Sequence, residues 1–269
     1  MDNSLLGDRM KEYERRNQYW LQTRTPVIIR VDMRAGHTFT KGFQRPFDEV
    51  FGNAMVRTME YCAANIGNCV FAYCQSDEIT FVLSDYRKLN TEAWFGYRTD
   101  KLCSIAASMA TMAFNSFFAE EVRFFRDNHC KVDEHFGFCS DAWDNEKNET
   151  LYATYCKKLR TAMFDARCFN IPKEEVCNCI YWRQLDAMRN SIQMVGQANY
   201  SHSYLQNKSC EQIKMLLRCD FGINWNGLPT RWKRGVAWTK VNGTDYEMPI
   251  LRGEDRKYVD DEVYFVEEE

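Results

Sequence analysis

The stretch Val27-Ile28-Ile29-Arg30-Val31-Asp32 is an apolar, mostly β-branched run that ends in a carboxylate. Such a run is typical of a buried β-strand. A second stretch, residues 69–83, contains two apolar runs joined by the polar residues Ser76, Asp77 and Glu78, which predicts a hairpin. A strand ending in Asp32 beside a hairpin tip carrying Asp77 can place the two carboxylates side by side at a sheet edge.

Carboxylate oxygens in such an arrangement suit Mg²⁺, which in proteins takes one or two carboxylates together with substrate phosphates. The arrangement is typical of the metal platform in a palm-type nucleotidyl-transfer enzyme. Asp is also a common turn residue, so an acidic hairpin turn in an ordinary sheet is the alternative. Either stretch taken alone leaves that alternative open.

Composition limits the class of protein. The chain has 269 residues, of which 45% are hydrophobic and 14% aromatic, enough for one large domain. We expect no membrane span, because no apolar run approaches the ~20 residues that cross a bilayer. We expect no signal peptide either, because the N-terminus is polar and mixed in charge. These features predict a cytoplasmic protein.

Cysteine usage and net charge add two expectations. The twelve cysteines contain no Cys-x-x-Cys pair, so we expect reduced, mostly buried thiols. The formal net charge of −3 argues against a general nucleic-acid coat protein. It leaves a specific nucleic-acid site open, because binding depends on where the positive charge lies.

The order of predicted elements indicates the fold class. Pro46 and Asp48 are expected to open a helix through about residue 66, with Asp48 as its N-cap. A long helix rich in small residues is expected from Asn90 or Thr91 to about residue 118, followed by irregular chain over 119–160. Residues 162–169 alternate like a strand, and Pro172 starts another helix. The order β-α-β-β-α-β is the split βαβ plan, so we predict an α+β fold: a palm-like, ferredoxin-like antiparallel sheet flanked by helices.

The domain prediction follows from the absence of internal repeats and low-complexity tracts. We expect residues 1–269 to form a single palm-type nucleotidyltransferase domain with a catalytic core at about 24–170. Residues from about 171 to 269 are expected to be a C-terminal helical and β-arm elaboration for RNA binding or oligomerisation. Within it, residues 231–240 are expected to form a basic strand or hairpin arm.

The motifs together resemble those of the tRNA-His guanylyltransferase family, the 3′-to-5′ nucleotide polymerases. The matched pieces are Leu6-Gly7-Asp8-Arg9-Met10-Lys11, Arg30-Val31-Asp32, His37-Thr38-Phe39, Arg45-Pro46-Phe47-Asp48, Gln75-Ser76-Asp77-Glu78, Lys101, Trp182-Arg183-Gln184 with Asp186, and Lys233-Arg234-Gly235. Their order and spacing run through nearly the whole chain and are more specific than two carboxylates alone.

The resemblance implies a palm-like core, a homotetramer, two Mg²⁺ ions, and ATP or GTP as substrates. The other partner would be tRNA, bound through its 5′ end and acceptor stem. In the chemistry of this family, a nucleoside triphosphate first activates the RNA 5′-monophosphate with loss of pyrophosphate. The 3′-hydroxyl of the incoming nucleotide then attacks the activated end, so both steps are in-line phosphoryl transfers.

Three sets of site residues are carried over from the resemblance. The metals would be bound by Asp32, Asp77 and the main-chain carbonyl of Met33, with Glu78 supporting this catalytic pair. The nucleotide-binding candidates begin with Met33 and the loop Arg34-Ala35-Gly36-His37, whose main-chain N–H groups can hold a triphosphate. Polar or cationic candidates for the phosphates are Arg45, Ser76, Arg98 and Lys101. The RNA-binding candidates are Arg183, Arg189, Asn190, Arg231, Lys233 and Arg234.

Two departures from the family pattern bear on activity and branch. The family has Gly after the first Asp, where this chain has Met33; a carbonyl ligand is retained there if the φ of Met33 is negative. The sequence Met188-Arg189-Asn190-Ser191 stands where the eukaryotic enzymes that add one untemplated G have His-Ile-Asn-Asn. This favours the bacterial, archaeal and viral branch, which extends 5′-truncated tRNAs using the opposite strand as template.

The predicted function is therefore template-dependent 3′-to-5′ addition of nucleotides to the 5′ end of truncated tRNA. A catalytically impaired RNA-binding palm protein is one alternative, because of Met33. A nucleotide cyclase or dinucleotide synthase is another, although the hairpin tip lacks the Gly-Gly-Asp/Glu-Glu-Phe signature of diguanylate cyclases.

Overall fold

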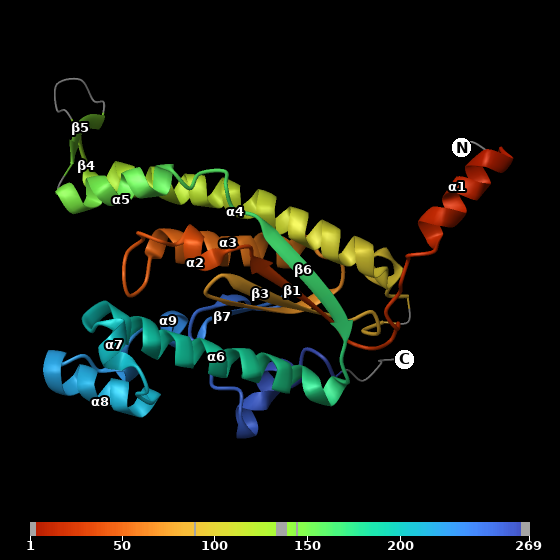
Figure 1. Ribbon diagram of the computed structural model, residues 1–269. Helices are drawn as coiled ribbons and strands as arrows, with labels where there is room; N and C mark the ends of the chain where they lie inside the picture. Colours follow the sequence, from red (N-terminus) through yellow and green to blue (C-terminus); the bar gives the residue numbers. More distant parts are fainter. Residues whose placement is uncertain (1–3, 89, 133–138, 144, 265–269) are drawn as a thin grey trace.

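Six strands form one antiparallel sheet in the order β6-β1-β3-β2-β7-β8 (Figure 1). The computed structural model describes residues 4–88, 90–132, 139–143 and 145–264. The strands of this sheet are β1 (Val27–Met33), β2 (Cys69–Gln75), β3 (Glu78–Leu83), β6 (Phe164–Asn170), β7 (Val236–Thr239) and β8 (Gly243–Asp245). A separate two-stranded sheet pairs β4 (Cys130–Val132) with β5 (Cys139–Trp143).

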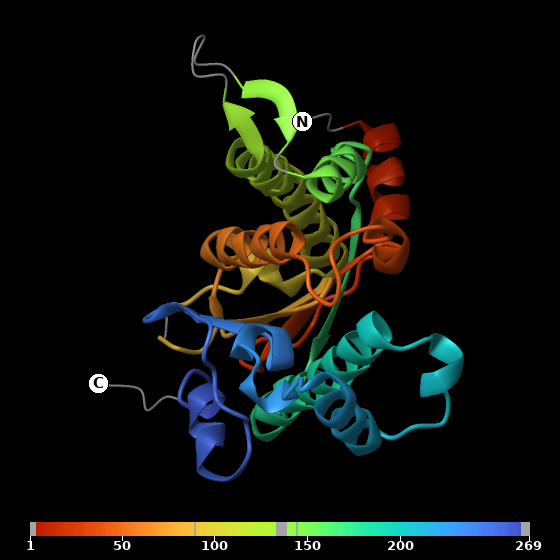
Figure 2. The same cartoon turned by 90° about the vertical axis from the view of Figure 1, so that its left-hand side faces the viewer.

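Helices cover both faces of the main sheet. The α-helices are α1 (Leu5–Arg15), α2 (Gly36–Phe39), α3 (Glu49–Asn65), α4 (Thr99–His129), α5 (Glu146–Cys156), α6 (Lys173–Asn199), α7 (His202–Leu205), α8 (Cys210–Phe221), α9 (Thr230–Arg234) and α10 (Lys257–Asp260). The 3₁₀ helices are η1 (Trp94–Tyr97), η2 (Trp225–Gly227) and η3 (Gly253–Arg256). Figures 1 and 2 show α7 and α8 beyond the sheet, on the C-terminal half of α6.

Alternation along the strands separates two apolar layers. Ile29 and Val31 of β1 point to the face covered by α3 and α4, and belong to the larger buried cluster. Ile28 points to the opposite face, where it packs with Val176 and Ile180 of α6. Successive residues of a strand face opposite sides of a sheet, so β1 reads as a continuous apolar run because both faces are covered.

The α+β fold class predicted from the sequence is confirmed. The strand order β6-β1-β3-β2 is that of a split βαβ sheet, and β7 and β8 extend it on the β2 side. The division into a catalytic core and a C-terminal elaboration stays a prediction, although β7 joins the C-terminal part of the chain to the same sheet.

Three element predictions were wrong. The long helix begins at Thr99 rather than near Asn90, because Phe95 and Gly96 have φ of +50° and +58° and interrupt the helical backbone. The stretch 119–160 is not irregular, since it contains the end of α4, β4, β5 and α5. The predicted strand or hairpin arm over 231–240 was wrong only in its first part: residues 231–234 lie on helix α9, which ends before Gly235 with its φ of +86°, whereas Val236–Thr239 form β7 and pair with β8.

Helix α4 is the one helix among the described residues that is long and apolar enough to cross a membrane. Its buried residues, including Leu102, Ala106 and Phe114, belong to the core cluster that covers the sheet. A core helix of a water-soluble fold meets the same criterion of length and composition.

Most cysteines of the described residues are free thiols. Burial raises the pKa of Cys62 and of Cys74 to about 12, so both thiols stay protonated near neutral pH. Cys130 is disulfide-bonded, so the expectation of reduced thiols throughout was wrong at that position.

An aromatic cluster fixes the chain that follows β1. Phe39 of α2 makes edge contacts with Phe43 and with Phe114 and Phe118 of α4, with ring centroids 5.5–5.7 Å apart. Phe43 also contacts Tyr155 of α5 at 4.9 Å. Aromatic pairs of this kind contribute about 0.5–1.5 kcal/mol each beyond the area they bury. The loop between β1 and α3 is therefore held against the core at several points.

Asp48 joins the same loop to α3, as its predicted N-cap. Its carboxylate accepts hydrogen bonds from the Phe51 N–H at 2.8 Å and the Gln44 N–H at 2.9 Å. The Tyr155 hydroxyl donates a third, at 2.6 Å. Burial raises the pKa of Asp48, and the bond from Tyr155 opposes that rise.

We predict that Asp48→Ala lowers the free energy of unfolding by about 2–4 kcal/mol, the sum of a lost helix cap and an unpaired buried hydroxyl. Denaturant unfolding followed by circular dichroism measures this loss. Asp48→Asn is the control, because its amide oxygen can still cap α3, and it should lose clearly less. Equal losses for the two variants would show that the cap contributes little.

Candidate active site

Three carboxylates face the same side of the sheet. In the antiparallel ladders, Asp32 of β1 lies opposite Asp165 of β6 on one side and opposite Glu78 of β3 on the other. Directly opposed residues point to the same face, with Cβ atoms about 4.5–5.5 Å apart. This face is the one covered by α6.

Asp77 at the hairpin tip contacts the segment that follows β1. The Met33 N–H donates to the Asp77 carbonyl at 3.0 Å. Gly36 lies so close that a Cβ placed on it would be 1.8 Å from Oδ2 of Asp77. Ser76, just before Asp77, has a φ of +51° and turns the hairpin. The end of β1, the following loop and the hairpin tip therefore meet at one point.

The acidic residues differ in their partners. Burial, and then the charges of Asp77 and Asp165, raise the pKa of Asp32, while Arg167 and Arg30 act to lower it. Glu78 accepts bonds from Nε and Nη2 of Arg183 at 2.6 and 2.9 Å. The ion pairs of the described residues include neither Asp32 nor Asp77. Glu78 is therefore neutralised by the protein, and Asp32 and Asp77 are not.

These donors fit a hard divalent cation. Among the described residues no group of three or more His, Cys, Asp or Glu side chains suits a metal ion, so the protein offers no closed cage. Mg²⁺ prefers one or two carboxylates and keeps its other positions for water and substrate phosphates. Asp32 and Asp77 supply the carboxylates, and the close approach of Gly36 leaves Asp77 room that a Cβ would fill.

Met33 does not require the backbone freedom of glycine. It lies within β1, 3% exposed, with its side chain in the core cluster. The non-glycine residues with positive φ in the described chain do not include it, whereas Ala35 has φ of +54°. A carbonyl at position 33 can therefore take part in metal binding with methionine present.

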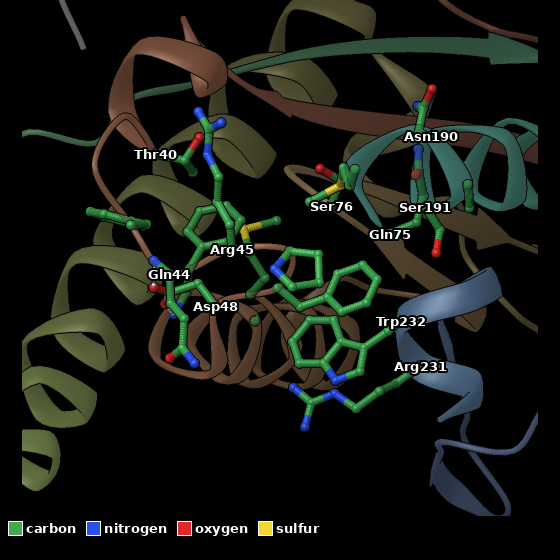
Figure 3. A pocket seen from close by; sticks show the side chains of 18 of the residues that line it. Thr40, Gln44, Arg45, Asp48, Gln75, Ser76, Asn190, Ser191, Arg231 and Trp232 are labelled. Atoms are coloured by element: carbon green, nitrogen blue, oxygen red, sulfur yellow. Dashed lines mark hydrogen bonds between the residues drawn. The ribbon is translucent and has the colours of Figure 1, made fainter. Parts of the chain in front are cut away.

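A cavity of about 500 Å³ opens beside the hairpin tip (Figure 3). Its lining includes Ser76, next to Asp77 in the chain, and His37, next to Gly36. Thr40, Gln44 and Arg45 line it from the loop before α3, while Asn190 and Ser191 line it from α6. Pockets of 300–1,000 Å³ are usual for small-molecule ligands.

An aromatic pair closes part of the cavity wall. Phe47 stacks on Trp232 of α9, with ring centroids 5.1 Å apart and planes within 6°. The guanidinium of Arg231 lies 4.3 Å from the Trp232 ring centre and forms an ion pair with Glu49. Further apolar lining from α3, α6 and β7 includes Met55, Val56, Ala187 and Val236.

The structure brings together only part of the predicted nucleotide-binding set. His37, Arg45 and Ser76 line the cavity. Met33, Ala35 and Gly36 lie beside Asp77 or just before α2, and Arg34 is exposed, with its guanidinium 3.9 Å from Sδ of Met163.

Arg98 and Lys101 are placed elsewhere within the chain. They lie at the start of α4, where the Thr99 carbonyl faces Cys168 of β6. The end of β1 that carries Asp32 lies near a later part of α4, where Oγ1 of Thr111 accepts a hydrogen bond from the Phe164 N–H. Ten residues of helix separate Lys101 from Thr111, about 15 Å. Arg98 and Lys101 do not line the cavity, and their contact with nucleotide stays a prediction.

The predicted RNA-binding residues are mostly engaged with protein groups. Asp186 accepts from Arg183, Arg189 and Asn190 at 3.3, 2.6 and 3.3 Å. On α9, Arg231 bonds Asn53, Lys233 donates to the Asn226 carbonyl at 2.6 Å, and Arg234 donates to the Met248 carbonyl at 2.9 Å. RNA contact by these six residues stays a prediction.

Sequence reasoning missed the cavity walls. Phe47 and Asp48 belong to a recognised motif, Arg45-Pro46-Phe47-Asp48, and that motif was the available signal. The wall residues Thr40, Gln44, Ser191 and Trp232 come from segments far apart in the chain, and no local pattern connects them.

The split βαβ sheet, with unneutralised carboxylates beside a cavity, defines a palm-type protein with a site for phosphoryl chemistry. A family model described as tRNAHis guanylyltransferase (Thg1) matches residues 7–172. The chain therefore belongs to the tRNA-His guanylyltransferase family, and it is a nucleotidyltransferase.

Relatives and solved structures agree with this assignment. Uncharacterized protein R259 of Acanthamoeba polyphaga mimivirus is 27% identical over 248 residues, which cover 88% of this chain and 78% of that protein. The tRNA(His) guanylyltransferase of Schizosaccharomyces pombe is 25% identical over 244 residues, 86% of this chain and 78% of the relative.

Among solved structures, a bacterial tRNA(His) guanylyltransferase (Thg1)-like protein in complex with ATP matches with a TM-score of 0.80 and 36% identity. That match covers 97% of this chain and 100% of the other. The enzyme from Saccharomyces cerevisiae matches with a TM-score of 0.60 at 19% identity, over 86% of this chain and 93% of that one, which supports the fold alone.

We predict that Gly36→Ala reduces nucleotidyl transfer by about 100-fold or more, because the added Cβ displaces the Asp77 carboxylate and small misplacements at a reaction centre cost this much. Steady-state rates with RNA and nucleoside triphosphate measure the loss. Gly227→Ala is the control, since its Cβ would meet only Nδ2 of Asn224, at 3.9 Å. Full activity in Gly36→Ala would mean that the position of Asp77 is not critical.

We predict that Asp32→Asn abolishes transfer and raises the melting temperature by about 1–3 °C at pH 7 in chelator. Because the pKa of Asp32 is raised from 3.8 in the folded protein, its ionised form opposes folding. Stability of the wild type should therefore fall as pH rises just above that value, and the variant should lack this component.

Melting curves between pH 4 and pH 7 test the Asp32→Asn prediction. Asp127→Asn, which removes an exposed carboxylate paired with Arg126 at 2.8 Å, serves as control and should change stability little. A marked loss of stability in Asp32→Asn would assign the carboxylate a structural role.

Proposed function

We propose that this protein adds nucleotides in the 3′-to-5′ direction to the 5′ end of truncated tRNA, using the opposite strand as template. One observation carries the proposal: Asp32 and Asp77 lie close enough to repel each other, without an ion pair among the described residues, and Ser76 and His37 of the same segments line a cavity of about 500 Å³. Membership of the tRNA-His guanylyltransferase family supports tRNA as the substrate.

Two Mg²⁺ ions would be held by Asp32, Asp77 and the Met33 carbonyl. When bound, they would stabilise charge on the attacking and leaving oxygens of an in-line phosphoryl transfer. The residues' own contribution is to fix those donors: β1 holds Asp32 in its ladder, and the Met33 N–H holds the hairpin tip. Glu78, bound to Arg183, keeps that arginine beside the site and adds little net charge.

ATP or GTP would occupy the cavity beside the carboxylates. The apolar wall from Met55 to Val236 would cover the base, while Arg45, His37 and Ser76 would face the phosphates. The bacterial Thg1-like proteins solved with ATP and with GTP, 36% and 33% identical to this chain, support these two nucleotides as substrates.

The reaction would take place in two transfers. An oxygen of the RNA 5′-monophosphate attacks the α-phosphorus of the triphosphate, and pyrophosphate leaves. The 3′-hydroxyl of the incoming nucleotide then attacks the 5′-phosphorus, and the activating nucleoside monophosphate leaves. The absence of His-Ile-Asn-Asn at residues 188–191, together with the likeness to a bacterial Thg1-like protein, favours templated repair over addition of a single G. The homotetramer stays a prediction, which the sedimentation mass of the purified protein checks.

The test uses a 5′-monophosphorylated tRNA that lacks its first nucleotides, with Mg²⁺, ATP and all four nucleoside triphosphates. We expect a nucleotide-capped intermediate, followed by extension whose sequence changes when the opposite strand of the acceptor stem is changed. Asp77→Asn should give neither product. Asp127→Asn, far from the site, should give both.

Each failure has a distinct meaning. A capped RNA that is never extended would refute polymerisation while retaining activation of the 5′ end. Addition of G regardless of the opposite strand would refute templating. Cyclic or dinucleotide products from triphosphates alone, with no RNA reaction, would assign the site to a different substrate.

A further inference from the structure

We propose that a basic rim, formed by Arg34, Lys157, Lys158 and Arg160, binds the phosphate backbone of the RNA duplex next to the reacting 5′ end. None of the four lines the cavity, and they follow β1 and α5, whereas the six RNA-binding residues predicted from the sequence lie on α6 and α9. This inference rests on the proposed function, because it assigns the path of the RNA substrate at the same site.

The rim is joined to the site by the main chain. The Arg34 N–H donates to the Met163 carbonyl at 2.9 Å, one residue beyond the point where Met33 pairs with Phe164. Nζ of Lys158 donates to the Thr38 carbonyl at 3.0 Å, on α2. Figures 1 and 2 show α2 and α5 side by side.

Distance along the chain places the rim within a few nucleotides of the carboxylates. Asp165 lies opposite Asp32, and Arg160 precedes Asp165 by five positions in the chain, a span of at most about 17 Å. Duplex nucleic acid rises about 3.4 Å per nucleotide of one strand, so this span corresponds to about five nucleotides. A 5′ end at Asp32 and Asp77 would therefore bring the next phosphates to the rim.

Among the described residues none of the four rim cations forms an ion pair, and Lys158 instead donates to the Thr38 carbonyl. Arg34, Lys157 and Arg160 are exposed, and the ion pairs of the described residues include none of them. The acidic residue that follows in the chain, Asp165, is 3.5 Å from Nη2 of Arg167. The rim thus presents uncompensated positive charge, which is what releases counterions from a nucleic-acid backbone.

The arginines on α6 and α9 are closer to neutral, because acidic side chains pair with them. Asp186 binds both Arg183 and Arg189, and Glu78 also binds Arg183. Arg231 is paired with Glu49. To contact phosphate, these arginines would have to give up charge-assisted bonds, whereas the exposed rim cations Lys157 and Arg160 would give up no ion pair.

The segment carrying the rim has a fixed shape. Main-chain bonds run from the Lys158 N–H to the Tyr155 carbonyl at 2.9 Å and from the Thr161 N–H to the Lys158 carbonyl at 3.2 Å. The side-chain amide of Asn115 on α4 then bonds the main chain of Ala162 twice: Nδ2 donates to the Ala162 carbonyl at 2.9 Å, and Oδ1 accepts from the Ala162 N–H at 3.3 Å. Cations held on an ordered segment lose little freedom when they bind phosphate.

Stabilisation of α5 is the competing explanation, because cations after the last turn of a helix interact favourably with its dipole. In that case, their removal would lower stability and leave RNA binding unchanged. The two explanations therefore predict opposite results for the same variant.

The test measures binding of a fluorescent, 5′-phosphorylated RNA hairpin carrying the acceptor stem, by anisotropy at several salt concentrations. The rim variant is Lys157→Gln combined with Arg160→Asn, chosen because Asn tolerates the φ of +61° at position 160. Two exposed cations on α8 and α10 are replaced in the control variant, Arg218→Gln combined with Lys257→Gln.

For the rim variant, we expect the dissociation constant for RNA to rise about tenfold or more, with the slope of log affinity against log salt smaller by about two. ATP binding and the melting temperature should not change, and the control should bind RNA like the wild type. The rim assignment would be overturned by unchanged RNA binding in the rim variant. It would also be overturned by an equal loss in the control.

A second variant, Arg189→Gln combined with Lys233→Gln, tests the predicted RNA-binding residues on α6 and α9 directly. If that variant loses RNA affinity while the rim variant does not, the RNA binds to α6 and α9 and the rim proposal fails. The proposed function is judged separately: wild-type protein that extends truncated tRNA supports it whichever residues bind the backbone. Wild-type protein that binds the hairpin but extends no tRNA would refute it, whatever the rim variant does.

Discussion

The forced proximity of two carboxylates is the constraint on which the site depends. Asp32 and Asp77 carry like charges; burial first, and then the repulsion from Asp77, raises the pKa of Asp32. The surrounding structure resists that repulsion: β1 is held between β3 and β6, and the Met33 N–H is bonded to the Asp77 carbonyl. Glu78 would add a third charge, but Arg183 neutralises it. The unrelieved negative charge is thereby confined to two side chains, where a divalent cation would be most strongly attracted.

The sequence predicted those parts of the fold that local signals specify. The apolar runs gave β1 and the β2–β3 hairpin, and Asp48 after Pro46 gave the start of α3, because strand alternation and helix caps depend on residues a few positions apart. The carboxylate pair was also predictable, since the end of a strand and a hairpin tip share a sheet edge. The resemblance to a family joined these fragments into one architecture.

Features set by distant contacts or unusual backbone were not predictable. Positive φ at Phe95 and Gly96 delays α4, and no residue in that stretch except glycine signals it. Lys101 matched a motif, yet the direction of α4 takes it away from the carboxylates. The stacking of Phe47 on Trp232 joins residues far apart in the chain, so the cavity wall could be known only from the folded structure. The ion pair between Arg183 and Glu78 likewise depends on tertiary contacts between α6 and β3.

Strand β1 lies between β3 and β6 in the sheet. The hairpin that supplies β3 follows β1 closely in the chain, whereas β6 comes almost a hundred residues later than β2. During synthesis, the first half of the protein therefore emerges with one row of main-chain N–H and carbonyl groups of β1 unpaired. That row is a template for association with another nascent chain until Phe164–Asn170 leaves the ribosome and docks. Fragments that end before residue 170 should accordingly aggregate, and the position of β6 sets the shortest N-terminal piece of this protein that can be handled in solution.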